Sequence, residues 1–482
     1  MLPSTFVMAD LHTITPELFM CGAAFAILMI DLFISPQRRG LIHFLSILVL
    51  VAAAVLTARD MASVQTFAFT NMFVRDIASD VLKMSVYLVT AFSLIYAKPY
   101  LQDRDLFKGE FYALALFSVL GMMLMISAAS MVTLYLGLEL LALSTYGLVA
   151  MDRDNRLASE AAMKYFVLGS MASGLLLYGM SMIYGATGSL QLDEVYAASG
   201  IASNQNMLLL GVVFMLVGIA FKFGAAPFHM WLPDVYQGAP TAVTLLIAAA
   251  PKLAAFGMAY RLLETGVGTA DVQWGDMVAY LAAISLVIGN LAALVQTNLK
   301  RLLAYSTISH VGFLFMGLVC ADNTGYSAAM FYAISYSLMS AAAFAEIITL
   351  SRKGFEAEEV SDFRGLWQHN PFHALMVLFV MASLAGVPPF LGFWAKLEVI
   401  NAALVSGYTW LAILSVVAAV VGAFYYLRII RAMFFEEPKG EAPRLHSDLH
   451  LRIAFTINAL ALLIMGVFAE PILSWCRQAF PV

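Results

Sequence analysis

Cysteine is scarce in this chain, which has three among its 482 residues: Cys21, Cys320 and Cys476. They lie far apart, and the sequence contains no C-x-x-C pair of the kind that holds an iron–sulfur cluster or a zinc ion. We therefore expect no iron–sulfur cluster and no zinc or other metal site in this chain. Any electron transfer associated with it has to take place in other chains.

Charged residues are also few, at 12% of the chain, whereas 62% of the residues are hydrophobic and the mean hydropathy is +0.85. These values exclude a soluble globular protein. No polar stretch is long enough for a separate soluble domain, so we expect a single membrane domain over residues 1–482. The lipid bilayer is its expected surrounding, and we expect no nucleic-acid partner.

The first apolar run lacks the basic start of a secretory signal peptide and carries Glu17 early and Asp31 late. We expect it to remain as the first of about fourteen transmembrane helices in an all-α polytopic fold. The expected spans are residues 14–34, 41–58, 78–97, 111–128, 131–150, 160–185, 208–230, 240–261, 277–296, 302–320, 326–350, 372–403, 408–427 and 452–473.

The loops between these spans alternate in basic charge, which indicates orientation because cytoplasmic loops are enriched in Lys and Arg. Most of the 26 Lys and Arg fall in loops on one side. The other side receives only Arg59, Arg75, Arg261 and Arg477. Both termini then lie on the sparsely charged side, which predicts that they face outward.

Two spans contain helix-breaking residues at membrane depth. The seventh has Gly224 and Pro227, the twelfth has Pro388 and Pro389, and the two G-x-x-P-F motifs lie 162 residues apart. Five spans separate them, and an odd offset reverses the direction of crossing. We therefore predict broken seventh and twelfth helices in two inverted five-helix repeats. The expected divisions are the first three helices (1–110), the first repeat (111–261), the second repeat (277–434) and the last loop and helix (435–482).

Four charged residues lie inside apolar spans where a purely structural role is the weaker interpretation. Glu139 is central in the fifth span, Lys222 and Lys396 flank the breaks, and Lys252 is central in the eighth span. A charge at the centre of a bilayer helix costs roughly 2.5–3.5 kcal/mol on insertion scales, so such groups usually mark ion pathways. A carboxylate that moves toward or away from a buried lysine can switch its protonation. With His310 between them, these residues predict a proton relay across the middle of the membrane.

Three further residues are candidate relay groups, each with a structural alternative. Lys164 lies one turn inside the sixth span, so it either extends its ammonium to the interface or joins the relay. His229 follows the first break on the basic side and lies either in a hydrated loop or on a route for proton uptake. His310 lies among Ser and Tyr, and it is either a hydrogen-bonded structural histidine or a proton carrier.

The remaining charged residues near the spans have simpler interpretations. Lys83 lies one turn from Asp80 and Asp76 near the outer face, so we expect it to extend to the interface or to pair locally. Glu346 and Glu398 lie near span ends or away from the break, and we assign neither a role.

Four motifs carry a resemblance to a known family: L-G-L-E-L around Glu139, K-F-G-A-A-P-F-H-M-W-L-P-D-V-Y-Q-G-A-P-T from Lys222, N-L-K-R-L-L-A-Y-S-T-I-S-H-V-G ahead of and including His310, and G-V-P-P-F-L-G-F-W-A-K up to Lys396. The chain resembles the antiporter-like membrane subunits of respiratory complex I, and among them the subunit N branch with its mitochondrial counterpart, NADH dehydrogenase subunit 2. The resemblance extends from about the third span to the end.

The resemblance implies a function and a set of residues. It implies fourteen helices with two broken ones, one proton channel and no cofactor in this chain. Glu139, Lys222, Lys252 and Lys396 match the family's proton-translocating positions, and Lys164 and His310 match further polar positions on its central axis. FMN, iron–sulfur clusters, NADH and quinone would belong to partner subunits of the complex, and the partners would include further antiporter-like subunits.

The interpretation that follows is a proton-translocating, non-redox subunit of NADH:quinone oxidoreductase in a bacterial inner membrane, with periplasmic termini. Two alternatives remain open. One is a subunit of a multisubunit cation/proton antiporter, which would use the same lysines without NADH. The other is a structural scaffold of the membrane arm, in which the lysines only hold helices together.

Overall fold

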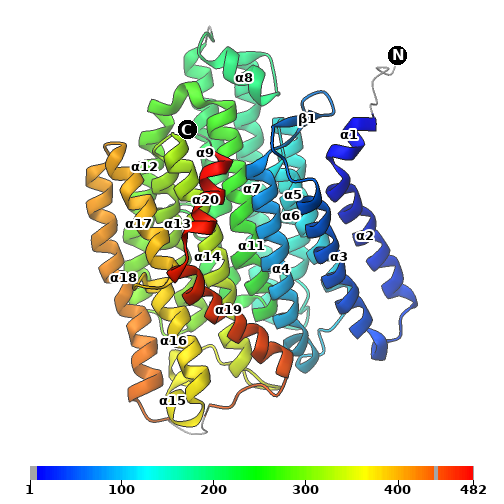
Figure 1. The fold of residues 1–482 in the computed structure, drawn as a ribbon, viewed down its shortest axis with the longest axis vertical. Helices are drawn as coiled ribbons and strands as arrows, with labels where there is room; N and C mark the ends of the chain where they lie inside the picture. The colour runs from blue at the N-terminus through cyan, green and yellow to red at the C-terminus, as the bar shows by residue number, and fades with distance from the viewer. Residues whose placement is uncertain (1–7, 203, 439–442, 481–482) are drawn as a thin grey trace.

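The computed structural model describes residues 8–202, 204–438 and 443–480, which form a bundle of helices running mostly along one direction (Figure 1). A small hairpin of strands β1 (Thr66–Ala68) and β2 (Phe73–Arg75) is the exception, and it pairs antiparallel with Thr66 opposite Arg75. The prediction of an all-α membrane fold is confirmed.

The first part of the chain forms helices up to and just beyond the first predicted break. They are α1 (Met8–Thr13), α2 (Thr15–Phe33), the 3₁₀ turn η1 (Pro36–Arg38), α3 (Gly40–Arg59), α4 (Ile77–Asp103), α5 (Gly109–Ile126), α6 (Met131–Val149), α7 (Arg156–Thr187), α8 (Leu192–Ser199), α9 (Gln205–Phe223), α10 (Trp231–Gly238) and α11 (Thr241–Tyr260).

The second part begins with a π-helical turn, η2 (Arg261–Gly266), and a 3₁₀ turn, η3 (Gly268–Ala270). The elements that follow are α12 (Asp271–Leu294), α13 (Leu299–Leu318), α14 (Asn323–Leu350), η4 (Val360–Phe363), α15 (Leu366–His369), α16 (Pro371–Ala385), α17 (Leu391–Val405), α18 (Thr409–Phe435), α19 (Leu449–Val467) and α20 (Glu470–Ala479).

Twelve helices of the described residues are long and apolar enough to cross a membrane. Helix α13 and the pair α16 and α17 occupy the two other predicted spans, so each predicted span contains at least one helix. Helical structure satisfies all backbone polar groups within the segment, which the absence of water in a bilayer requires. The number of crossings itself stays a prediction.

The end of the chain differs from the prediction. The last expected span, residues 452–473, ends in the structure at Val467, and the separate helix α20 begins at Glu470. Pro471 has no backbone N–H and cannot continue a helix from α19, but it fits the first turn of a new one. The short helices α8 and α15 also lie outside the predicted spans.

Polar side chains mark where the membrane helices begin. Asp76 accepts a hydrogen bond from the backbone N–H of Ser79 at 2.8 Å ahead of α4, and Asn298 accepts one from Arg301 N at 3.0 Å ahead of α13. The first turn of a helix has backbone N–H groups without partners in the helix, so such caps stabilise its start. These caps fix the helix ends at the polar edges of the bundle.

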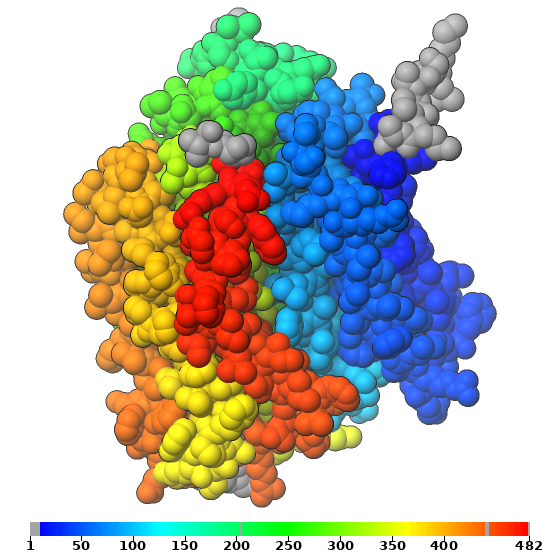
Figure 2. Space-filling model, viewed as in Figure 1, coloured from blue at the N-terminus to red at the C-terminus, as the bar shows by residue number. Residues whose placement is uncertain are grey.

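The loops gather at two ends of the bundle, which Figure 1 shows as upper and lower. The β1–β2 hairpin, α1, α8 and α20 lie toward the upper end, and α15 lies at the lower end. Helices α19 and α20, drawn in red, lie against the N-terminal half of the chain in Figure 2, where both contact α4.

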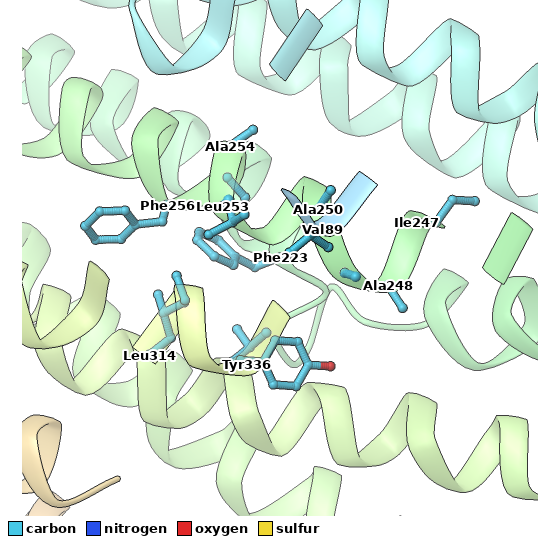
Figure 3. Close-up of a cluster of buried hydrophobic side chains, with 14 of the residues drawn as sticks. Val89, Phe223, Ile247, Ala248, Ala250, Leu253, Ala254, Phe256, Leu314 and Tyr336 are labelled. Atoms are coloured by element: carbon cyan, nitrogen blue, oxygen red, sulfur yellow. The ribbon is translucent and has the colours of Figure 1, made fainter. Parts of the chain in front are cut away.

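The centre of the bundle is formed by α11 and α14, whose most apolar windows are completely buried. Figure 3 shows part of this core, with Leu253 and Phe256 of α11 near Leu314 of α13 and Phe223 at the end of α9. The lysine of α11 and the serines and tyrosines of α14 are therefore enclosed by protein rather than by lipid.

A buried ion pair joins α2 to α4 and corrects the expectation for Lys83. Its ammonium lies 2.6 Å from a carboxylate oxygen of Glu17, and the Lys83 side chain is 1% exposed. The nearby acids already have partners, because Arg75 pairs with Asp80 at 3.1 Å and Arg261 pairs with Asp76 at 2.8 Å. Lys83 therefore neither extends to the interface nor pairs locally.

Candidate functional site

Both predicted breaks interrupt a helix in the structure. Helix α9 ends at Phe223 and is followed by Gly224 with φ +75°, whereas α16 ends at Ala385 and is followed by Gly386 with φ +85°. Glycine adopts this left-handed conformation without strain. Pro227 lies in the first connecting turn, and Pro388 and Pro389 lie in the second. Each break leaves the last carbonyl groups of a helix open inside the protein.

Lys252 of α11 binds at the first break. Its ammonium donates a hydrogen bond of 2.6 Å to the carbonyl oxygen of Phe223, the last residue of α9. The residue is only 3% exposed, and the ammonium lies 6.0 Å from the centre of the Trp231 ring. A helix end and an aromatic face are both favourable neighbours for a cation.

Lys396 of α17 binds at the second break in the same way. Its ammonium donates to the carbonyl oxygens of Ala385 at 2.8 Å and Leu384 at 3.0 Å, at the end of α16. It is 9% exposed and lies 5.2 Å from the centre of the Phe313 ring. The protein therefore holds two deeply buried lysines by one device, the negative end of an interrupted helix.

Lys222, two residues before Gly224, lies in a different setting. It is half-buried, and the negative charge of Glu139 attracts its ammonium. It lines a cavity of about 20 Å³ together with Ser173, Tyr165 and Trp231, among others. A cavity of this size has room for a water molecule beside polar groups.

Glu139 of α6 is connected to this cavity through one serine. Ser173 of α7 donates a hydrogen bond to a carboxylate oxygen of Glu139 and lies 3.1 Å from the hydroxyl of Tyr135. Ser173 also lines the cavity with Lys222, so it connects the carboxylate to that cavity, and the opposite charges of Glu139 and Lys222 attract.

The outer face of α6 reaches the edge of the chain at Glu139. Glu139 itself is half-buried, and Leu136 and Leu143, three and four residues away on the same helix face, are 60% and 57% exposed. A carboxylate at this depth is costly against lipid. We therefore expect another protein to cover this face.

Trp231 connects the two parts of the first region. Its indole N–H donates to the carbonyl of Phe221 at 3.0 Å, and its ring lies beside Lys252 and lines the cavity of Lys222. Lys222 and Lys252 are also near enough for their like charges to repel. A proton on one of them therefore disfavours a proton on the other.

His310 of α13 is buried and has a partner on each ring nitrogen. The hydroxyl of Tyr332 lies 2.6 Å from Nδ1, and that of Tyr426 lies 3.1 Å from Nε2 and is hydrogen-bonded to Ser306. The ring of Phe313, which Lys396 contacts, stacks on Tyr332 at 6.0 Å. The structure thus brings His310 into the region of Lys396, where the structural and the proton-carrying roles share the same hydrogen bonds.

Lys164 and His229 lie apart from these groups. Lys164 has a side-chain exposure of 42% and pairs with Asp234 at 2.7 Å and Glu160 at 2.9 Å. His229 is half-buried in the turn between α9 and α10, and its Nδ1 has no partner among the described residues. The ion pairs of Lys164 agree with its structural alternative, and both relay roles stay predictions.

Several polar groups of the site were not singled out in the sequence. Ser173, Tyr165, Tyr332 and Tyr426 contact or surround the charged residues, yet Ser and Tyr are common in apolar helices and carry no distinguishing signal alone. Helical spacing from a charged residue can indicate a polar neighbour, as it does for Tyr135, which lies four residues before Glu139. The contacts of these side chains involve residues of α7, α13 and α18, so they depend on tertiary packing.

Comparison with known proteins identifies close relatives over nearly the whole chain. The family model described as NADH:quinone oxidoreductase/Mrp antiporter, TM, matches residues 128–422. The NADH-quinone oxidoreductase subunit N of Xanthomonas euvesicatoria pv. vesicatoria is 55% identical over 472 residues, which cover 98% of this chain and 97% of that protein.

Solved structures agree with this result. A chain of respiratory complex I from Thermus thermophilus with bound aureothin is 32% identical, with a TM-score of 0.81 that covers 95% of this chain and 98% of that one. A chain of the Mrp complex from Dietzia sp. DQ12-45-1b has a TM-score of 0.84 and covers 97% of each chain at 22% identity. At that identity the likeness is one of fold.

Proposed function

The chain belongs to the NADH-quinone oxidoreductase subunit N family, and from this premise we propose that it moves protons through the membrane arm of a respiratory complex I. It is a multi-pass membrane subunit of an oxidoreductase complex, and its own part of the reaction is proton translocation without redox chemistry. NADH, FMN, iron–sulfur clusters and quinone act in partner subunits. The described residues offer no cluster of His, Cys, Asp and Glu suited to a metal ion.

One observation carries the proposal: two buried lysines, Lys252 and Lys396, each donate to the open carbonyl end of an interrupted helix. A carbonyl accepts a hydrogen bond from an ammonium and also from a neutral amine, so the contact survives the loss of the proton. A site of this kind binds a proton and releases it without rearrangement of the helices. A lysine held only by a carboxylate would lose its partner's stabilisation when it became neutral.

The direction of transfer is proposed from the resemblance to the family. Protons enter from the side of the basic loops and load Lys222 and Lys252. They pass along the buried axis toward His310 and Lys396 and leave on the other side of the membrane. His229 and Lys164 are proposed as further groups on the uptake side of the first break.

Glu139 is the proposed control on this path. Its carboxylate accepts a hydrogen bond from Ser173, which lines the cavity of Lys222, and it lies at the edge of the chain, where a neighbouring antiporter-like subunit would cover it. At an effective dielectric of about 20, unit charges 4 Å apart interact by about 4 kcal/mol. A change in the neighbour that moves or neutralises Glu139 would therefore change how firmly Lys222 holds its proton.

We also propose the two inverted repeats, 111–261 and 277–434, as the architectural basis of the two break sites. Matched backbone hydrogen bonds support them. Met131 N donates to Leu190 O at 2.9 Å, and 168 residues later Leu299 N donates to Glu358 O at 2.5 Å. The first three helices (1–110) and the last loop and helix (435–482) flank the repeats in this proposal, although residues 1–7, 439–442 and 481–482 lie outside the described structure.

The proposed location is a bacterial inner membrane, with the basic loops in the cytoplasm and both termini in the periplasm. The charge asymmetry of the loops supports this orientation. In the antiporter alternative the same lysines would transfer the protons, and proton transfer would be coupled to cation transport and not to NADH oxidation. The likeness to the Dietzia Mrp chain concerns the fold alone and does not favour it.

The experiment that tests the proposal begins with gentle detergent extraction of the tagged chain. The co-purifying proteins are identified, and the eluate is assayed for NADH:quinone activity. The proposal predicts flavin, iron–sulfur subunits and NADH oxidation in the eluate. A set of small membrane subunits with no redox protein would favour the antiporter, whereas normal pumping but poor assembly of Lys222→Ala would favour the scaffold.

A further inference from the structure

Glu346 of α14 is a buried acid with no role in the path described above. Its exposure is 0%, and neither carboxyl oxygen has a hydrogen-bond partner among the described residues. An unpaired carboxylate inside a protein is very unfavourable, so this side chain is stable there as the neutral acid. Even then its O–H donor and its acceptor oxygen are unsatisfied, which costs stability that an alanine or leucine would not.

The position of Glu346 on α14 connects it to the second break. Tyr332, Ser335, Met339, Glu346 and Thr349 recur at intervals of three, four or seven residues, so they lie along one face of the helix. Ser335 is completely buried and its hydroxyl also lacks a partner within the described structure. One helix face therefore carries two orphan polar groups, and such groups in protein interiors are commonly satisfied by buried water.

The upper part of this face reaches the region of Lys396. Tyr332 bonds to Nδ1 of His310 at 2.6 Å and stacks on Phe313, which contacts the ammonium of Lys396. One turn beyond Ser335, Met339 faces α17, since a Cβ built on Gly392 would lie 2.9 Å from its sulfur. This face thus packs against the helix that carries Lys396.

The lower part of the face reaches the polar end of the bundle. The carbonyl of Thr349 accepts a hydrogen bond of 2.7 Å from the backbone N–H of His446, and the His446 ring lies 3.2 Å from a carboxylate oxygen of Asp103. The side chains of His446 and Asp103 are 12% and 29% exposed. Glu346 lies three residues from Thr349, about 4.5 Å along the helix axis, so it is one turn away from groups that water reaches.

We propose that Glu346 is a proton-binding group on a second uptake route, which starts beside His446 and Asp103 and follows this face of α14 to His310 and Lys396. The inference rests on the proposed function and adds to it: Lys396 would receive protons from the basic side directly, and not only from Lys252. In each transfer one Glu346 oxygen binds an incoming proton while the proton on the other oxygen passes to buried water on this face, because Ser335 lies eleven residues, about 16.5 Å, farther along the helix. No net charge then builds up on the acid.

The isosteric variant Glu346→Gln tests the route, because glutamine keeps the size and polarity of the neutral acid but cannot pass a proton in this way. Variants are made in the whole complex, purified and reconstituted into liposomes, and NADH-driven proton pumping is measured with a pH-indicating dye. We expect Glu346→Gln to lower pumping about tenfold and Glu346→Asp, which keeps the carboxyl, to lower it about twofold. The control Glu398→Gln removes a half-buried carboxyl of α17 outside this face and should change pumping less than twofold.

A packing role gives the opposite order. Aspartate is shorter by one methylene, so packing alone predicts that Glu346→Asp is worse than Glu346→Gln, and that result would overturn the inference. Failure of Glu346→Gln to assemble would also count against it, since glutamine mimics the proposed resting state. Lys396→Ala is measured in parallel: if it abolishes pumping while Glu346→Gln does not, only the second route fails, and if it leaves pumping intact, the proposed function fails.

Discussion

Both interrupted helices bind a buried lysine in the same way, but the surroundings of the two breaks differ. At both breaks a glycine in the left-handed conformation ends the helix, and a buried lysine binds the open carbonyls. Two residues before Gly224 stands Lys222, whereas two residues before Gly386 stands Leu384. The first region thus has a second lysine, a cavity and a partner carboxylate, and the second has Lys396 with tyrosines and His310 nearby.

The difference indicates a division of labour between the regions. In the first, Glu139, Lys222 and Lys252 influence one another through charge, so the proton affinity of the region can be changed from outside the chain. In the second, no ion pair among the described residues joins Lys396 to a carboxylate, and its affinity is set by the fixed carbonyls of α16. The first region is therefore suited to the control of proton binding, and the second to the passage of protons.

Removal of the single lysine in the second region should have the largest effect. We expect Lys396→Ala to lower NADH-driven proton pumping about a hundredfold, because no neighbouring lysine can replace it. Pumping is measured in liposomes that contain the purified complex. Lys108→Ala, in a loop, is the control and should pump normally; retention of more than half of the activity by Lys396→Ala would mean that the second break is not on the path.

The variant Lys222→Leu makes the first region resemble the second. We expect about a tenfold loss of pumping, smaller than for Lys396, because Lys252 remains at the break and can still take up protons. Comparison with Lys252→Ala, measured in the same liposomes, sharpens the contrast. A loss for Lys222→Leu that equals or exceeds the loss for Lys396→Ala would contradict the idea that the first region has two loading groups.

Gly386→Ala tests the geometry of the second break. A Cβ at this position would lie 2.8 Å from Cδ of Lys396 and would also have to adopt φ +85°. We expect a loss of about 1 kcal/mol in stability from the conformation and a threefold to tenfold loss of pumping, roughly estimated, from displacement of the lysine.

The matched control is Gly407→Ala, at φ +88° with no atom within 4 Å of the added Cβ. It should show the same conformational cost in the thermal unfolding of the complex with normal pumping. Equal pumping by the two variants would show that the position of Lys396 tolerates displacement.

Glu356→Gln should have the smallest effect on pumping, because this residue fastens the two regions to each other outside the membrane-spanning segments. Its carboxylate accepts hydrogen bonds from Tyr100 at 3.0 Å, from Arg104 at 2.7 Å and from Thr241. Burial raises the pKa of Glu356, but Lys300 and Arg104 outweigh burial and hold the pKa below the usual value of a glutamate.

A depressed pKa in the folded state contributes stability above the unfolded pKa, and this stability is lost as the pH falls through the folded pKa. We therefore expect Glu356→Gln to unfold about 2 kcal/mol more easily at pH 7, with a difference that shrinks below about pH 4. Thermal unfolding of the complex across this pH range measures it. A difference that grows toward low pH would contradict the assignment.

The sequence predicted the spans and the breaks well, because charge, proline and glycine inside long apolar runs leave few structural solutions. Glu139, Lys222, Lys252 and Lys396 are conspicuous for the same reason. The contact of Lys83 with Glu17 could not be predicted, since it depends on how α2 lies against α4 and on Arg75 and Arg261 having taken the nearer acids. The contact of His310 with Tyr426 likewise joins helices that lie 116 residues apart in the sequence.

The most direct test of the central claim is NADH-driven proton pumping by the complex that carries Lys396→Arg. Arginine keeps the positive charge and can bond to the carbonyls of α16, but it does not lose its proton in proteins. If Lys396 passes protons, the variant should assemble normally and pump as poorly as Lys396→Ala. Normal pumping by Lys396→Arg would show that the charge alone matters and would contradict the account.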